Sequence, residues 1–268
     1  MAELLDREAR VSYPQRGDRY THYIFDPFTN PDLAIKARQA HSEGYVSAGL
    51  ATPKAVGKDG FLVKEIDKSG DYPHATCFMA ENPDNPEDRA TARLVWPEGN
   101  VLANLPTYPL VESGVSSEYS AELDKLICSG YEVGEFCAFA KTNEASHRAV
   151  SEIVRAVFFE TAGNKKILYC SMVKEVHEAM SSQLSPANFQ IIGKPVILDK
   201  NQYRRETVLL PVAISPDDFA DNIFEAFRNE KDPAKKEAYR RSLMFMVSGV
   251  GFGIFSEALS TYLISGKV

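Results

Sequence analysis

The sequence is poor in the residues that mark several functional classes. It has four cysteines and one tryptophan, and no two cysteines form a C-x-x-C pair. Zinc sites and thioredoxin-like redox centres are therefore not expected, and neither is any other metal site. Scattered, unpaired cysteines are typical of a reduced, cytoplasmic protein. The stretch from Met1 to Glu8 has no apolar core of the kind that a secretion signal needs, which favours the same location.

Positive charge is also scarce. The chain has 30 Lys and Arg against 37 Asp and Glu, a formal net charge of −7. A broad basic face that could neutralise nucleic-acid phosphates is therefore not expected. The longest uncharged apolar run, 243–255, is shorter than the roughly 20 residues that a membrane span requires. With 44% hydrophobic and 25% charged residues, the composition is that of an ordinary soluble globular protein.

The middle of the chain predicts an α/β (α+β) fold. Apolar runs with strand character alternate with helical stretches, in the order strand 131–140, helix 144–162, strand 166–172, helix 173–184, strand 188–193 and strand 206–215. Two strands joined through a helix are expected to run parallel inside a mixed sheet.

The N-terminal half predicts a helix over 30–48, which starts at Asn30 as N-cap with Pro31 in its first turn. Strands are predicted at 74–81 and 89–96, joined by a hairpin turn over 82–88. We divide the chain into an irregular segment 1–30, a main α/β domain 31–215 and a helical extension 216–268.

Within that extension, a continuous helix is predicted over 233–264. Its apolar run 243–255 could pack on the body of the protein, meet a second copy, or contact a membrane surface or an acyl chain. The glycines at 249, 251 and 253 do not have the spacing of a dinucleotide-binding loop.

Glu132 and the strand that follows it are typical of acyl transfer to an amine. A carboxylate at the mouth of an apolar strand can be partly desolvated and act as a general base; the alternative is that Glu132 only caps the strand. Backbone N–H groups between Phe139 and Thr142 could stabilise an oxyanion. The turn from Lys141 to His147 opens a helix, whose free N–H groups suit a donor phosphate.

Arg93 lies inside an otherwise apolar strand and needs a polar partner. Asp67, Asp71 and Glu132 are the candidates, either in a substrate pocket or in a purely structural ion pair. A different class of enzyme would use Cys137 as nucleophile, assisted by His177.

Taken in order, the motifs resemble those of the acyl-homoserine-lactone synthases and the long-chain N-acyl amino acid synthases of the GNAT superfamily. The resemblance covers about 30–215. It is carried by Arg38, Glu65-Ile-Asp67 with Asp71, Ala75-Thr-Cys-Phe-Met79, Arg93-Leu94, Leu105-Pro-Thr107, Glu132-Val-Gly-Glu-Phe136, Ile192-Gly193 and Thr207-Val-Leu-Leu-Pro-Val212. The chain departs from the pattern at Glu135, where the family has Arg. It also lacks the aromatic cluster of the adenosylmethionine pocket, which favours another amine as acceptor.

The resemblance implies a GNAT-like, mostly antiparallel twisted sheet flanked by helices. It also implies an N-acyltransferase that moves a fatty acyl group from acyl carrier protein or acyl-CoA to a small amine such as an amino acid, with no tightly bound cofactor. Glu132 and Arg93 are its expected catalytic residues. The expected substrate-binding residues are Arg38, Asp67, Asp71, Phe139, Ala140, Lys141, Thr142 and Arg148. A carrier protein would dock on Lys141, Arg148, Lys165 and Lys166; the alternative is a GNAT-like module that binds or assembles without catalysis.

Overall fold

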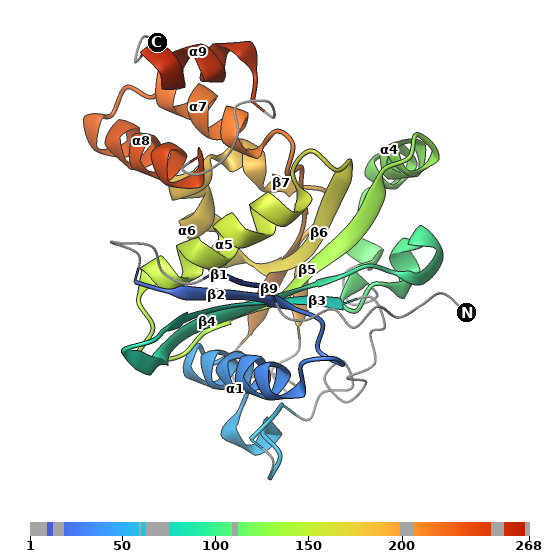
Figure 1. The fold of residues 1–268 in the computed structure, drawn as a ribbon. Helices are drawn as coiled ribbons and strands as arrows, with labels where there is room; N and C mark the ends of the chain where they lie inside the picture. The colour runs from blue at the N-terminus through green and yellow to red at the C-terminus, as the bar shows by residue number, and fades with distance from the viewer. Residues whose placement is uncertain are drawn as a thin grey trace. The chain divides into compact units, whose positions relative to one another are not determined.

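The computed structural model describes residues 10–12, 19–58, 60–62, 75–108, 112–198, 206–247 and 255–265. They form a mixed α/β fold with two compact units (Figure 1). The first unit comprises Met1–Pro109, Gly134–Val157 and Ile197–Thr207, and the second comprises Leu110–Val133, Phe158–Val196 and Val208–Val268.

The first unit is built on an antiparallel sheet in which each strand pairs with the next along the chain. Its strands are β1 (Arg10–Ser12), β2 (Thr21–Phe25), β3 (Ala75–Asn82), β4 (Asn85–Val95) and β5 (Glu132–Lys141). The expected mostly antiparallel sheet is thus confirmed. Residues 21–25 were predicted to be irregular, and this is wrong: they pair with β3 along their whole length, and Thr21 and Phe25 are buried on one face of the strand.

Two helices cover opposite faces of this sheet, as Figure 1 shows: α1 (Pro31–Ser47) and α5 (His147–Thr161). Ala37 of α1 packs with Phe25 and Cys77 on one face. On the other face, His22 Nε2 lies 3.3 Å from a carboxylate oxygen of Glu152 in α5. The predicted helix at 30–48 is confirmed. Asn30 is its N-cap residue, as expected, but the Asn30 side chain donates to the Asp26 carbonyl and makes no capping hydrogen bond.

The β3–β4 hairpin is tighter than the predicted seven-residue turn. Asn82 pairs with Asn85, so only Pro83 and Asp84 form the turn. The Asn82 side chain accepts a hydrogen bond from the Asp84 N–H at 3.1 Å. This local bond closes the turn early and extends β4.

The second unit combines antiparallel strands with most of the helices. β9 pairs with both β6 and β7. Its strands are β6 (Lys166–Val173), β7 (Gln190–Ile191) and β9 (Thr207–Ile214); the chain passes from the second unit to the first within β8 (Val196–Leu198). The helices are α4 (Ser117–Cys128), α6 (Lys174–Leu184), α7 (Phe219–Asn229), α8 (Pro233–Val247) and α9 (Glu257–Ser265).

The C-terminal segment is not the continuous helix that was predicted over 233–264. Residues 255 and 256 are not helical, and Ser256 accepts a hydrogen bond from the Leu259 N–H at the start of α9. Leu243 and Leu259 are fully buried, and the Tyr262 ring lies 5.2 Å from that of Phe224. The described part of this segment therefore packs on its own unit. Within the described ranges, no helix is both long and apolar enough to cross a bilayer.

Candidate active site

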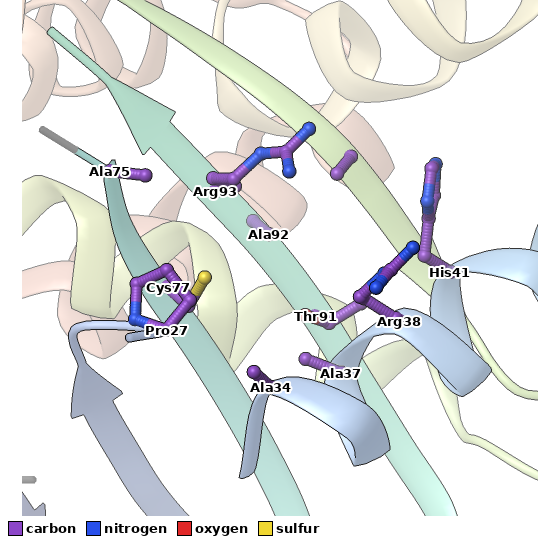
Figure 2. A pocket seen from close by; sticks show the side chains of 11 residues that line it. Pro27, Ala34, Ala37, Arg38, His41, Ala75, Cys77, Thr91, Ala92 and Arg93 are labelled. Carbon is purple, nitrogen blue, oxygen red and sulfur yellow. The ribbon is translucent and has the colours of Figure 1, made fainter. Parts of the chain in front are cut away.

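A pocket lies between α1 and the sheet of the first unit (Figure 2). Most of the side chains that line it are small, and this leaves open space above the strands. The lining residues are Pro27, Ala34, Ala37, Arg38, His41, Ala75, Cys77, Thr91, Ala92, Arg93 and Ala138. No acidic side chain is among these described residues.

Strand register explains how Arg93 reaches this pocket. Arg93 of β4 is directly opposite Cys77 of β3 and Cys137 of β5, so these three side chains form one row across the sheet. In the next row, Val95 is opposite both Ala75 and Glu135. Because side chains alternate between faces, both rows point toward α1.

The β4–β5 ladder is interrupted by a bulge beside the pocket. Two residues of β5, Ala138 and Phe139, face the single residue Ala92 of β4. Ala138 has φ of 52°, a left-handed conformation that a non-glycine residue adopts at a cost of about 1–3 kcal/mol. A bulge takes one residue out of the ladder and re-aims its neighbours. Strain and re-aimed backbone at a pocket wall are typical of functional sites.

Two arginines and a histidine are among the described residues that line the pocket. Arg93 projects from β4 and Arg38 from α1, and His41 lies one turn farther along the same helix (Figure 2). The Arg38 guanidinium lies 4.2 Å above the Phe61 ring, a cation–π contact that holds it in place. Two guanidinium groups on the wall of one pocket, with no acidic side chain among its described lining residues, are suited to binding an anionic group such as a carboxylate.

Glu135 is fully buried next to this pocket. Its Oε2 accepts a hydrogen bond from the Thr107 backbone N–H at 2.9 Å. Its Oε1 accepts no hydrogen bond from any described N–H or O–H group. Burial raises the pKa of Glu135 to about 7, and the Thr107 hydrogen bonds, the charge of Arg93 and the Cys137 thiol oppose this rise.

Glu132, the predicted base, has different surroundings. Its side chain is 60% exposed and forms an ion pair with Lys166 at the start of β6. The desolvation on which its expected basicity depended is therefore not present at this position. The alternative for Glu132 was a structural role at the end of the strand. The observed ion pair with Lys166 has the geometry of that role.

The turn between β5 and α5, expected to bind a donor phosphate, is largely occupied by groups of the chain itself. The Asn143 N–H donates to Glu43 at 2.7 Å, and the Ser146 N–H donates to Asp88 at 3.2 Å. The Lys141 ammonium donates to the Ala145 carbonyl at 2.7 Å. Carboxylates thus lie at two of the positions where a phosphate would need N–H donors.

The other predicted site residues are spread around the β5 bulge. Phe139 packs against Phe136, with ring centroids 5.1 Å apart. Ala140 pairs with Thr91 in the ladder. The remaining two are engaged elsewhere: the Thr142 N–H donates to the Arg89 carbonyl, and the half-exposed Arg148 pairs with Glu152. Asp67 and Asp71 lie outside the described residues, so their predicted contact with Arg93 stays a prediction.

Cys137 is poorly suited to act as a nucleophile. Burial raises its pKa to about 12, and the charge of Arg93 only partly opposes this. A thiolate is the reactive form of cysteine, and it would be rare at neutral pH. The expected assistant, His177, contacts the Phe189 carbonyl at 2.9 Å.

Sequence reasoning did not identify Glu135 as a buried carboxyl beside the pocket and treated it only as a departure from the family pattern. A signal was present, because Glu135 is an acidic residue in the middle of the apolar stretch Val133–Phe139. At such a position a carboxyl is either exposed on one face or buried with an altered pKa. Only the register of β5 against β4 decides between these outcomes.

Comparisons with known proteins bear on the fold. No protein-family model matches the chain, and no curated protein matches it. A solved structure of FeeM, an N-acyl amino acid synthase from uncultured soil microbes, aligns with a TM-score of 0.51 and 17% identity. The alignment covers 76% of this chain and 94% of FeeM. The chain has a GNAT-like fold.

A second solved structure, of FdhC, a nucleotide-linked sugar GNAT, aligns at a TM-score of 0.38 and 10% identity. The alignment covers 77% of this chain and 93% of FdhC. The GNAT-like fold predicted from the order of the motifs is confirmed by the FeeM alignment.

Proposed function

We propose that this protein is an N-acyltransferase that moves a fatty acyl group from acyl carrier protein or acyl-CoA to the amine of a small molecule such as an amino acid. The observation that carries the proposal is the pocket beside the β5 bulge, with Arg38 and Arg93 on its wall and a buried carboxyl next to it. The fold shared with FeeM, an N-acyl amino acid synthase, supports the same reaction class.

The pocket offers the acceptor two kinds of contact. The guanidinium groups of Arg38 and Arg93 suit a carboxylate, which a planar donor pair binds well. The alanine side chains of α1, β3 and β4 leave room for the carbon skeleton between them. An amino acid presents this combination of carboxylate, short skeleton and amine.

The donor thioester would lie along β5. Among the residues expected to bind it, Phe139 and Ala140 follow the bulge directly, where the re-aimed backbone could face the thioester carbonyl. Within this proposal Arg148 remains a candidate contact for the carrier, because half of its side chain is exposed.

The first test supplies the purified protein with acyl-carrier protein or acyl-CoA and pairs of matched amines. Each pair contains an amino acid and the same amine without its carboxylate, such as phenylalanine and phenethylamine. We expect the carboxylate-bearing member to be acylated preferentially, as measured by thiol release and by product mass.

Replacement of an arginine makes this test specific. Arg93→Met should raise KM for the amino acid about 10- to 100-fold, because a hydrogen bond to a charged group is worth about 1.5–3 kcal/mol. Arg155→Met, outside the pocket, is the matched control and should change KM little. Absence of product with every donor and amine would contradict the proposal and favour the non-catalytic binding module.

A further inference from the structure

Two fully buried carboxyl groups in the first unit differ sharply in their surroundings. Asp88 accepts hydrogen bonds from Tyr20 and Asn82 and pairs with Arg19 at 2.8 Å. Its oxygens are satisfied, as those of a structural carboxylate should be. Glu135 accepts the Thr107 N–H at Oε2, and the Thr107 side chain and the Cys137 thiol also act on its carboxyl, but its Oε1 has no N–H or O–H donor among the described residues. A buried oxygen without a donor is costly unless a bound molecule supplies one.

The position of Glu135 connects it to the pocket. Arg93, which lines the pocket, lies in the adjacent row of the same sheet face, and its charge acts on the Glu135 carboxyl. The other wall of the pocket is α1, on the same side of the sheet. An acceptor whose carboxylate is held by Arg38 and Arg93 would therefore bring its ammonium close to Glu135.

We propose that Glu135, and not Glu132, accepts the proton from the acceptor's ammonium. This inference rests on the proposed acyl transfer. The ammonium gives one proton to the Glu135 carboxylate, and the neutral amine then attacks the thioester carbonyl carbon. The C–N bond forms and the C–S bond breaks. The amine nitrogen loses a second proton, the leaving thiolate takes up one of the two protons, and the other passes to solvent.

Thr107 is a positioning residue in this scheme. The Thr107 N–H fixes Oε2, which leaves Oε1 as the oxygen that can meet the substrate. The pKa of Glu135, raised to about 7, makes the carboxyl a stronger base than an exposed glutamate while leaving much of it ionised at neutral pH. Glu132 lacks such surroundings, since it is exposed and paired with Lys166.

Other titratable groups face the same space. Burial raises the pKa of Cys77 to about 11 and that of Cys137 to about 12, so neither thiol titrates near neutrality. Arg93 and Arg38 stay charged over the whole range. His41 of α1 also lines the pocket and is ionisable, so it needs its own variant in the test.

The test compares Glu135→Gln, Glu135→Asp and the control Glu132→Gln in steady-state acyl transfer. Glu135→Gln should lower kcat by about 10²- to 10⁴-fold, the usual contribution of a general base, while Glu132→Gln stays within about threefold of wild type. Wild-type kcat/KM should rise with pH to a plateau with an inflection near 7. Glu135→Gln should lose this inflection, and His41→Gln should keep it.

An acceptor whose amine is already uncharged at neutral pH distinguishes a general base from a residue that only supports the structure. Aminooxyacetate carries a carboxylate and a weakly basic amine, so no proton needs to be removed before attack. Glu135→Gln should therefore recover most of the wild-type rate with this acceptor but not with an amino acid. Equal defects with both acceptors would overturn the assignment.

The outcomes separate the two proposals. If wild type acylates no amine, the acyltransferase proposal itself fails. If wild type is active and Glu135→Gln matches it in rate and pH profile, only the assignment of the base fails. If Glu135→Gln does not fold, Glu135→Asp provides a second test. Its carboxyl is one methylene group farther from the substrate, so this variant should still lower kcat and shift the inflection in the pH profile of kcat/KM. Wild-type behaviour of that variant would contradict the proposal.

Discussion

At the scale of single residues, the site depends on how each charge is buried. Glu135 and Asp88 are both inaccessible to solvent, but only Asp88 is surrounded by donors. Desolvation therefore dominates at Glu135 and raises its pKa to about 7. The folded protein binds a proton at Glu135 more tightly than the unfolded chain does, and this has a consequence for stability.

We predict that replacing Glu135 changes the pH dependence of unfolding. Because its pKa is higher in the folded state than in the unfolded chain, its favourable contribution is complete below about 4.5 and is lost as pH rises through about 7. Glu135→Gln cannot lose a proton. The variant should thus gain up to about 3 kcal/mol relative to wild type between pH 4.5 and 8. Urea unfolding at a series of pH values measures this difference, and a difference that stays constant with pH would contradict the prediction.

At the scale of elements, the pocket exists because the distance between α1 and the sheet varies along the helix. The helix contacts the sheet closely at Gly44 and leaves open space next to Arg38 and His41. At Gly44 the approach is so close that an added Cβ would lie 2.6 Å from the Lys141 carbonyl oxygen and 2.9 Å from the Ala140 Cβ. Earlier in the helix, Arg38 and His41, which lie six and three residues before Gly44, face the open space instead. The contact at Gly44 therefore fixes the height of α1 above the β5 bulge.

Gly44→Ala tests this contact. In an isolated helix the change would be favourable by about 1 kcal/mol. Here the clash is with backbone, so we expect a net loss of about 1–3 kcal/mol in unfolding free energy and a several-fold rise in KM for the acceptor. Gln39→Ala, at an exposed position of α1, is the matched control and should alter neither. Thermal unfolding and steady-state kinetics supply both numbers, and an unchanged KM would show that the height of α1 does not shape the pocket.

At the scale of the whole molecule, the net charge of −7 opposes the approach of an acidic carrier protein, so any docking must rely on local basic residues. Of the four that were predicted, Lys141, Arg148 and Lys166 have partners within the chain. Lys165 is exposed and lies next to the start of β6. Of the four, Lys165 is therefore the position where a charge reversal should affect carrier binding most.

Lys165→Glu should raise the apparent KM for a carrier-linked acyl donor about three- to tenfold at low ionic strength, with a smaller effect in high salt, since exposed charges steer encounter and are screened. KM for acyl-CoA should not change. Lys235→Glu, an exposed reversal in α8, controls for the altered net charge. Equal KM values for wild type and Lys165→Glu with the carrier would remove this surface from the docking proposal.

The order and type of most elements could be predicted from the sequence. The helix at 31–47 and the strands that became β3, β5, β6 and β9 follow from local signals, namely helix-start residues, apolar runs and turn residues, which act over a few positions. The same local reasoning failed at 255–256, where a hydrogen bond from the Ser256 N–H to Asp221 of α7 accompanies the break between helices. That partner is 35 positions away in the sequence.

The candidate site also has features that follow from local sequence and features that depend on tertiary contacts. The sequence by itself determined that Arg93 and two carboxyl groups lie on or beside apolar strands, because residue type and periodicity are enough for that. Which carboxyl is buried and which is exposed was decided only by tertiary structure: β5 pairs with β4 in a register that places Glu135 beside Arg93 and under Thr107, while Glu132 meets Lys166. Burial and pKa depend on atoms brought together from distant parts of the chain, and no local pattern contains that information.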